Sequence, residues 1–258
     1  MKKGLSVLIA AALLAGCAAQ PMGEGGGVAV SEADSQSRER ARAFTELADA
    51  YVARSQYKVA LDELRKAITA DSRYGPAYNV YGMIYMDLAE DTLAEDNFRR
   101  AIELDRNDSN ARNNYGWFLC TRGRYDEGLA QFSAAIRNPL YGQPELAMTN
   151  AGLCAEKKGD LALAEANLGK ALKLQPDNPN STLKLAGLHF RQGRLPEAQR
   201  LLERHDELAA PTAESLWLGV RLERRLGDRA REAAYALQLR KRFPDSDETR
   251  QLLAGHFE

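Results

Sequence analysis

The chain has 258 residues, of which 45% are hydrophobic, and its 35 lysines and arginines almost balance its 36 aspartates and glutamates. This length is sufficient for a sizeable core, and the balanced charge argues against a nucleic-acid-binding protein, which would carry an excess of positive charge. After the first 16 residues, no hydrophobic run approaches the roughly 20 residues that a helix needs to cross a bilayer.

The first 16 residues have the features of a secretory signal peptide. Lys2 and Lys3 precede an almost wholly apolar stretch that is too short for a membrane span. Residues 14–17 read Leu-Ala-Gly-Cys and resemble the lipobox of bacterial lipoproteins. The resemblance implies a diacylglycerol on Cys17, cleavage before it and acylation of the new N terminus. The alternative is an ordinary signal peptide that happens to contain a cysteine.

The residue after the lipobox cysteine indicates in which membrane a lipoprotein is anchored. In lipoproteins an aspartate at this place commonly retains the protein in the inner membrane, and this chain has Ala18 instead. The resemblance therefore implies an outer-membrane protein that is lipid-anchored and faces the periplasm. Each buried methylene contributes about 0.8 kcal/mol, so three acyl chains would make the attachment effectively permanent. Apart from this covalent lipid we expect no cofactor.

Residues 17–40 are expected to form the lipidated N terminus and a flexible tether. The stretch from Ala18 to about Gln36 is small, polar and glycine-rich, and its apolar residues show no periodicity. Such a composition is typical of a flexible linker. It would let the folded part stand off from the membrane surface.

From about residue 41 the chain repeats every 34 residues. Large apolar residues recur at Leu64, Phe98 and Phe132, and small residues recur at the same spacing on either side of them. Between Gly123 and Gly159 the spacing is 36, so two residues are inserted. They fall in a loop around residues 138–144, whose prolines and glycine forbid a continuous helix.

This period and its pattern resemble the tetratricopeptide repeat family. The second unit carries the pattern most clearly, with Tyr78, Gly82, Tyr85, Ala94, Phe98 and Ala101. The resemblance implies an all-α superhelical solenoid of helix-turn-helix units, which must stack because no unit buries its own apolar face. We expect six units between residues 41 and 246, followed by a C-terminal tail at 247–258. The units are 41–74, 75–108, 109–142, 145–178, 179–212 and 213–246.

The last two units depart from the pattern. The fifth has His205 where a small residue is expected, and the sixth has Val220 and Glu232 at its two small-residue places. Terminal repeats are often atypical because their outer face meets water. We therefore expect the sixth unit to act as a cap.

No motif for catalysis or metal binding occurs in the sequence. There is no glycine-rich phosphate loop, no HExxH and no GxSxG, so we expect neither an enzyme nor a small-molecule substrate. His189 lies where the repeat packs an aromatic residue, and we interpret it as a core residue. His205 lies among acidic residues and Arg204, which is more typical of a solvated helix face than of a metal site.

The sequence from Arg221 to Arg242 is locally basic, with Arg221, Arg224 and Arg225 closely spaced. It would suit anionic lipid or an acidic partner. The interleaved Glu223 and Glu232 favour the simpler interpretation of a solvated terminal face.

A tetratricopeptide stack lines its concave groove with first helices, so the inward-facing places follow from the register. Asparagines there would hold an extended backbone, while methionine and tryptophan would supply an adaptable apolar floor. Each of these side chains taken singly would also suit simple packing. We expect a protein-binding groove formed by Asn79, Met83, Met86, Asn113 and Trp117. In later units the same places carry the more charged set Glu156, Arg191, Trp217, Arg221 and Arg224.

Cys120 and Cys154 are 34 residues apart and lack the spacing of zinc or redox motifs. They lie near the ends of first helices in adjacent units, whose α-carbons can approach within the roughly 4.4–6.8 Å that a disulfide allows. An oxidising periplasm favours the bond. The alternative is two buried thiols that merely pack.

The lipobox, the tether and the six units together resemble the PilF/PilW family of type IV pilus biogenesis lipoproteins. The resemblance extends to the cysteine pair and to the sequence Asn-Asn-Tyr-Gly at residues 113–116. It implies a pilotin, which binds secretin subunits and promotes their outer-membrane localisation and multimerisation for pilus assembly. Two alternatives stay open. One is a scaffold for outer-membrane protein assembly or for peptidoglycan enzymes, and the other is an enzyme or its regulatory subunit.

Overall fold

The structure of the protein, a computed structural model, describes residues 32–257, so Cys17, the signal peptide and most of the expected tether lie outside the described residues. This part of the chain contains thirteen α-helices and no β-strand. None of these helices has the length and hydrophobicity needed to cross a bilayer. The helices are α1 (Glu32–Val52), α2 (Tyr57–Ala70), α3 (Gly75–Asp87), α4 (Asp91–Leu104), α5 (Ser109–Thr121), α6 (Tyr125–Ile136), α7 (Pro144–Lys158), α8 (Leu161–Leu174), α9 (Pro179–Arg191), α10 (Leu195–Leu208), α11 (Ala213–Leu226), α12 (Arg229–Arg242) and α13 (Asp247–Ala254).

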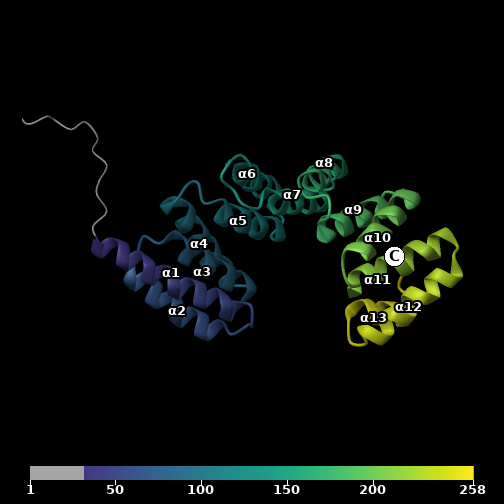
Figure 1. The fold of residues 1–258 in the computed structure, drawn as a ribbon, viewed down its shortest axis with the longest axis horizontal. Coiled ribbons are helices and arrows are strands. Elements are labelled where there is room, and N and C mark those ends of the chain that lie inside the picture. Colours follow the sequence, from purple (N-terminus) through teal and green to yellow (C-terminus); the bar gives the residue numbers. More distant parts are fainter. Residues whose placement is uncertain (1–31, 258) are drawn as a thin grey trace, which may run out of the picture.

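The first twelve helices form six pairs that stack into an arch. Each odd-numbered helix packs against the even-numbered helix that follows it and also against the next odd-numbered helix. Within residues 32–257, even-numbered helices do not contact one another. The odd-numbered helices therefore line the inner side of the arch, and α6 and α8 lie on its outer side (Figure 1). This all-α solenoid of six helix-turn-helix units is the fold predicted from the repeat.

Glycines at the crossing of the two helices explain how each pair packs so closely. A Cβ atom added at Gly82 would lie 2.7 Å from the ring of Phe98, and one at Gly116 would lie 2.9 Å from Phe132. Both rings are fully buried. The large side chain of the second helix therefore fills the space that the glycine of the first helix leaves open.

In the sixth unit this crossing is shifted by one residue from the place predicted. Gly219, not Val220, lies against a ring, and its added Cβ would be 2.7 Å from Tyr235. The prediction was wrong because Val220 instead packs with Leu216 and Leu239 in the core. The other predicted place, Glu232, is a half-buried acid that ion-pairs with arginines. The 16-residue spacing from Gly219 to Tyr235 equals that from Gly82 to Phe98, so the whole pair has moved together.

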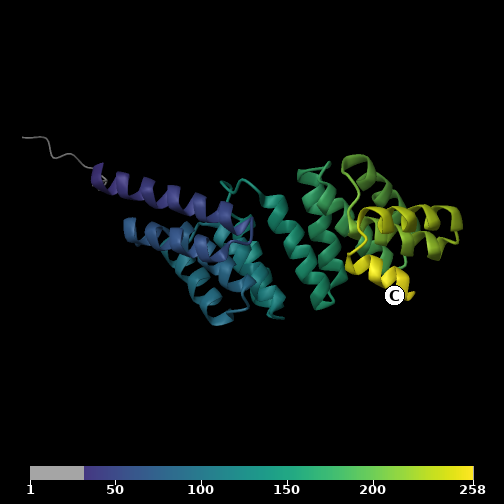
Figure 2. The same ribbon diagram turned by 90° about the horizontal axis from the view of Figure 1, so that it is seen from below.

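The expected tether overlaps the first helix, because α1 begins at Glu32 and not after residue 40. Two acidic residues in its first turn, Glu32 and Asp34, favour a helix N terminus electrostatically. Arg38 in the second turn lies 5.6 Å from the ring of Tyr74 and 3.8 Å from Asp71. Figure 2 shows this part of α1 projecting beyond the rest of the first pair.

The expected C-terminal tail contains a further helix, α13, which packs against α11 and α12. Ser246 caps its start by accepting a hydrogen bond from the backbone N–H of Thr249 at 3.1 Å. Behind it, the ring of Phe257 lies 5.6 Å from that of Trp217. This segment covers the sixth unit where the first helix of a seventh unit would otherwise pack, so it forms the cap of the solenoid.

Candidate protein-binding groove

The five predicted groove residues lie on two adjacent first helices, α3 and α5, on the inner side of the arch. Asn79 and Asn113 are nearly buried, with 9% and 4% of their surfaces exposed. Met83, Met86 and Trp117 are only half-buried. The apolar members of the set are therefore more accessible than the polar ones.

Asparagine side chains form a hydrogen-bonded ladder across three first helices. Asn114 on α5 donates to the side-chain oxygen of Asn79 on α3 at 3.1 Å. Asn150 on α7 donates to the oxygen of Asn113 at 3.0 Å, and Asn113 donates to Asn114 at 3.3 Å. The amide oxygens of Asn79 and Asn113 are thus already engaged, and their first role is to connect neighbouring units.

Sequence reasoning missed Asn114 and Asn150. The two lie 36 residues apart, which is one repeat plus the two inserted residues, so the corrected period would have aligned them. Their half-buried side chains lie nearer to the solvent than those of Asn79 and Asn113. They are the better candidates to meet the backbone of a bound segment.

The apolar part of the groove rests on the core of the second to fourth units. Met83 and Met86 pack against the buried cluster that contains Phe98 and Phe118. Trp117 packs against the cluster around the two cysteines, and the ammonium group of Lys157 lies 5.9 Å from its ring. The result is a semi-exposed apolar strip flanked by amides and a cation. Such a strip can bind a protein segment through apolar contacts and orient it through polar ones.

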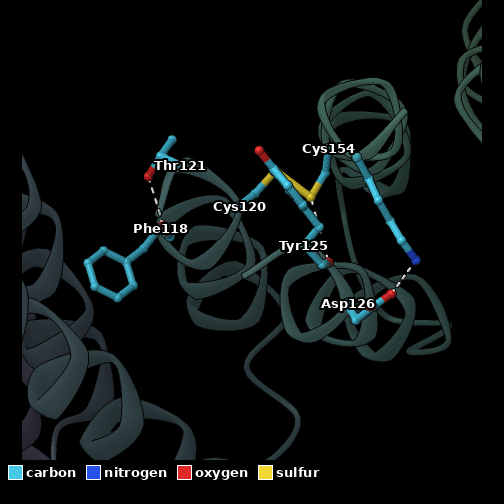
Figure 3. The surroundings of a disulfide bond; sticks show 7 residues. Phe118, Cys120, Thr121, Tyr125, Asp126 and Cys154 are labelled. Atoms are coloured by element: carbon cyan, nitrogen blue, oxygen red, sulfur yellow. Dashed lines mark hydrogen bonds and ion pairs between the residues drawn. A yellow bond between two sulfur atoms is a disulfide. The ribbon is translucent and has the colours of Figure 1, made fainter. Parts of the chain in front are cut away.

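The structure contains the predicted disulfide between Cys120 and Cys154, whose α-carbons are 5.7 Å apart. Both residues are buried, so Cys120 supports the groove from beneath and does not line it. Figure 3 shows the bond joining α5 to α7, beside the ion pair of Lys158 with Asp126 at 2.5 Å. The bond spans the junction that contains the two inserted residues.

The two histidines considered for other roles are both buried. His189 lies 3.5 Å from Glu165. Burial lowers the pKa of His189 and the positive charge of Arg194 adds to this, whereas Glu165 opposes it. The side chain of His205 contacts the backbone oxygen of Pro179 at 3.0 Å, which explains how a histidine takes the place of a small residue there.

Four family models match parts of the chain, at residues 75–108, 97–130, 120–167 and 155–217, and all four describe the tetratricopeptide repeat. None of these four describes a catalytic domain. The repeats and the groove lined by their first helices define a tetratricopeptide-repeat protein, a class whose extended concave surface binds other proteins.

Relatives that match along most of their length show to which family of tetratricopeptide-repeat proteins the chain belongs. The type IV pilus assembly protein PilF of Pseudomonas aeruginosa is 29% identical over 220 residues, which cover 85% of this chain and 87% of PilF. The solved structure of that PilF matches with a TM-score of 0.73 at 28% identity, covering 85% of this chain and 99% of the other. The crystal structure of PilW, a widely conserved type IV pilus biogenesis factor, matches with a TM-score of 0.75 at 32% identity, covering 83% and 98%. The chain belongs to the PilF/PilW family of type IV pilus biogenesis proteins.

Proposed function

We propose that this protein is a pilotin: an outer-membrane lipoprotein that binds secretin subunits and promotes their localisation and multimerisation in the outer membrane for type IV pilus assembly. The observation that carries the proposal is the similarity to PilF and PilW along nearly the whole length of both relatives. The lipobox that ends at Cys17 supports the membrane location.

The inner groove supplies the binding surface in this proposal. A secretin segment would cover the apolar strip of Met83, Met86 and Trp117, which binding would remove from water. The amides of Asn114 and Asn150 would pair with the backbone of that segment. Because the apolar strip and the amides lie on stacked helices, the surface is preorganised and little ordering is needed on binding.

A deletion strain tests the proposal directly. Without this protein, we expect the secretin to persist as monomer while its detergent-resistant multimers fall at least about tenfold. Membrane fractionation and immunoblotting of heated and unheated samples would measure both forms, with the wild-type gene supplied in trans as the control. Normal multimer levels in the deletion strain would contradict the proposal and favour a scaffold for outer-membrane protein assembly or peptidoglycan enzymes.

A further inference from the structure

A column of alternating arginine and aromatic side chains occupies the inner side of the fifth and sixth units. The guanidinium carbon of Arg225 lies 5.1 Å from the ring centre of Phe190. That of Arg221 lies 5.2 Å from Phe190 and 5.5 Å from Trp217. Arg221 therefore lies within cation–π distance of two rings, whose faces attract the cation.

Arg221 follows Met83, Trp117 and Leu153 by the repeat period, and all four side chains are half-buried. It lies next to the place that packs against the preceding unit. In each of the second to fifth units, the residue two places after the small residue at the helix crossing is buried and apolar. These residues are Ile84, Phe118, Cys154 and Leu188. In the sixth unit the residue that follows them by the repeat period is Leu222, which is fully buried and packs against the fifth unit. Arg221 is its neighbour and is only half-buried, so the packing of the two units does not require an arginine there.

Arg221 has no direct partner for its charge in the part of the chain that the structure describes. Among the described residues it makes no ion pair or hydrogen bond, and its Nε atom is buried without an acceptor. By contrast, Arg191 pairs with Glu156, and Arg224 pairs with Glu232 at 2.9 Å. A half-buried cation whose buried Nε–H lacks an acceptor is unfavourable, so an anion supplied from outside would stabilise this position.

The acid that acts on Arg221 from the protein itself is already engaged. Glu214 lies near enough to affect Arg221, but it is paired with Lys184 at 2.6 Å. Burial lowers the pKa of Arg221, and the positive charge of Arg191 adds to this effect. The guanidinium carries a fork of N–H donors that matches a carboxylate.

We propose that Arg221 anchors a carboxylate-binding site on the inner face of the fifth and sixth units, and that its ligand is an acidic peptide segment of a protein partner. Arg221 lies on α11, on the inner side of the arch, where a peptide segment can reach it, whereas a flat lipid surface would meet the outside of the arch first. This inference depends on the chemistry of Arg221 and not on the identity of the partner as a secretin, so it goes beyond the pilotin proposal.

Fluorescence anisotropy of labelled hexaglutamate with the purified full-length protein in a mild detergent tests the site. Arg221→Leu places an apolar residue where earlier units have Met83, Trp117 and Leu153, so we expect it to melt at or above the wild-type temperature while its Kd for hexaglutamate rises about tenfold or more. Arg221→Lys keeps the charge without the fork and should weaken binding at least about threefold. Lys241→Gln, which removes an exposed charge from α12, should change the Kd less than about twofold.

Three outcomes would overturn the proposal. The first is a wild-type protein that does not bind hexaglutamate in preference to hexaglutamine. The second is an equal loss of binding in Arg221→Leu and Lys241→Gln, which would indicate attraction to overall charge. The third is Arg221-dependent binding of short-chain phosphatidylglycerol with no such dependence for hexaglutamate, which would assign the site to a lipid headgroup. Because none of these measurements involves a secretin, failure of the pilotin proposal would leave their result unchanged.

Discussion

Side chains on the inner face divide between those that join neighbouring units and those that remain available to a partner. The amide ladder of Asn79, Asn114, Asn113 and Asn150 fixes α3, α5 and α7 relative to one another. Removing one amide would leave another buried polar group unpaired, which costs about 1–3 kcal/mol. The ladder thus holds the apolar strip beside it in one geometry.

Removing the apolar strip should weaken binding without unfolding the protein. We expect Met83→Ala combined with Trp117→Ala to raise the Kd for the secretin about tenfold or more, because large rigid side chains dominate binding surfaces. Both residues are half-buried, so far-UV circular dichroism should stay close to wild type. Leu93→Ala with Leu163→Ala removes leucines that are 44% and 38% exposed on second helices and is the matched control. A groove variant that binds as tightly as this control would place the contact elsewhere.

His189 should make the stability of the protein depend on pH. Burial keeps its pKa below the ordinary value of 6.5, so the unfolded chain binds a proton more readily than the folded protein. The unfolding free energy should therefore fall as the pH drops below about 6.5 towards the lowered pKa of the folded state. Urea titrations at about pH 7.5 and about pH 5 should show a larger loss for the wild type than for His189→Gln, since other groups titrate alike in both. Equal losses would show that the pKa of His189 is the same in the folded and unfolded states.

Helix pairs are the elements on which the fold and the groove depend, and the disulfide ties two of them together. It encloses 34 residues between α5 and α7, including the loop with the two inserted residues. In the chain-entropy model, closing a loop of this size stabilises the folded state by roughly 3–4 kcal/mol. We expect this contribution to be lost on reduction, and equally in the Cys120→Ala, Cys154→Ala variant.

Urea unfolding with and without reductant would measure that loss, and the double variant should not respond to reductant. If both thiols of the unreduced, unfolded wild-type protein were alkylated quantitatively, the bond would be absent in solution. The bond would then be replaced by two packed thiols, the alternative that the sequence also allowed.

The helix pairs could be predicted from the sequence because their packing is local and repeats. A glycine at 82 or 116 followed 16 residues later by a phenylalanine marks one close crossing, and the same period places the two cysteines on adjacent first helices. The shift of the sixth crossing to Gly219 could not be predicted, because it depends on where the Tyr235 ring packs in three dimensions. Nor could α13, whose eight residues are too few to be stable without α11 and α12 beside them.

The candidate site was predictable only in part, for a similar reason. The register identified which places face inwards, but not which amide oxygens their neighbours already occupy. Asn113 was expected to hold a ligand and instead accepts from Asn150, on the next unit. The contacts of Arg221 come from two units, so a list of basic residues could not distinguish it from the paired arginines around it.

On the scale of the whole molecule, the solenoid presents one continuous inner face whose chemistry changes along its length. The second and third units carry the apolar strip, and the fifth and sixth carry the arginine and aromatic column. The described chain begins at one end of the arch with α1 and ends at the other with α13 (Figure 1). A partner that lies along this face would meet apolar contacts first and a carboxylate-binding position farther from the N terminus.

The N terminus should attach this arch to the outer membrane through lipid on Cys17. Replacing Cys17 with Ser removes the acceptor for the acyl chains, each of whose buried methylenes contributes about 0.8 kcal/mol. We expect the variant to leave the outer-membrane fraction in sucrose-gradient fractionation and to show no incorporation of labelled fatty acid. Ala18→Asp is the matched control: it keeps the lipid and should shift the protein to the inner membrane. Continued outer-membrane association of the Cys17→Ser protein would contradict lipid anchoring.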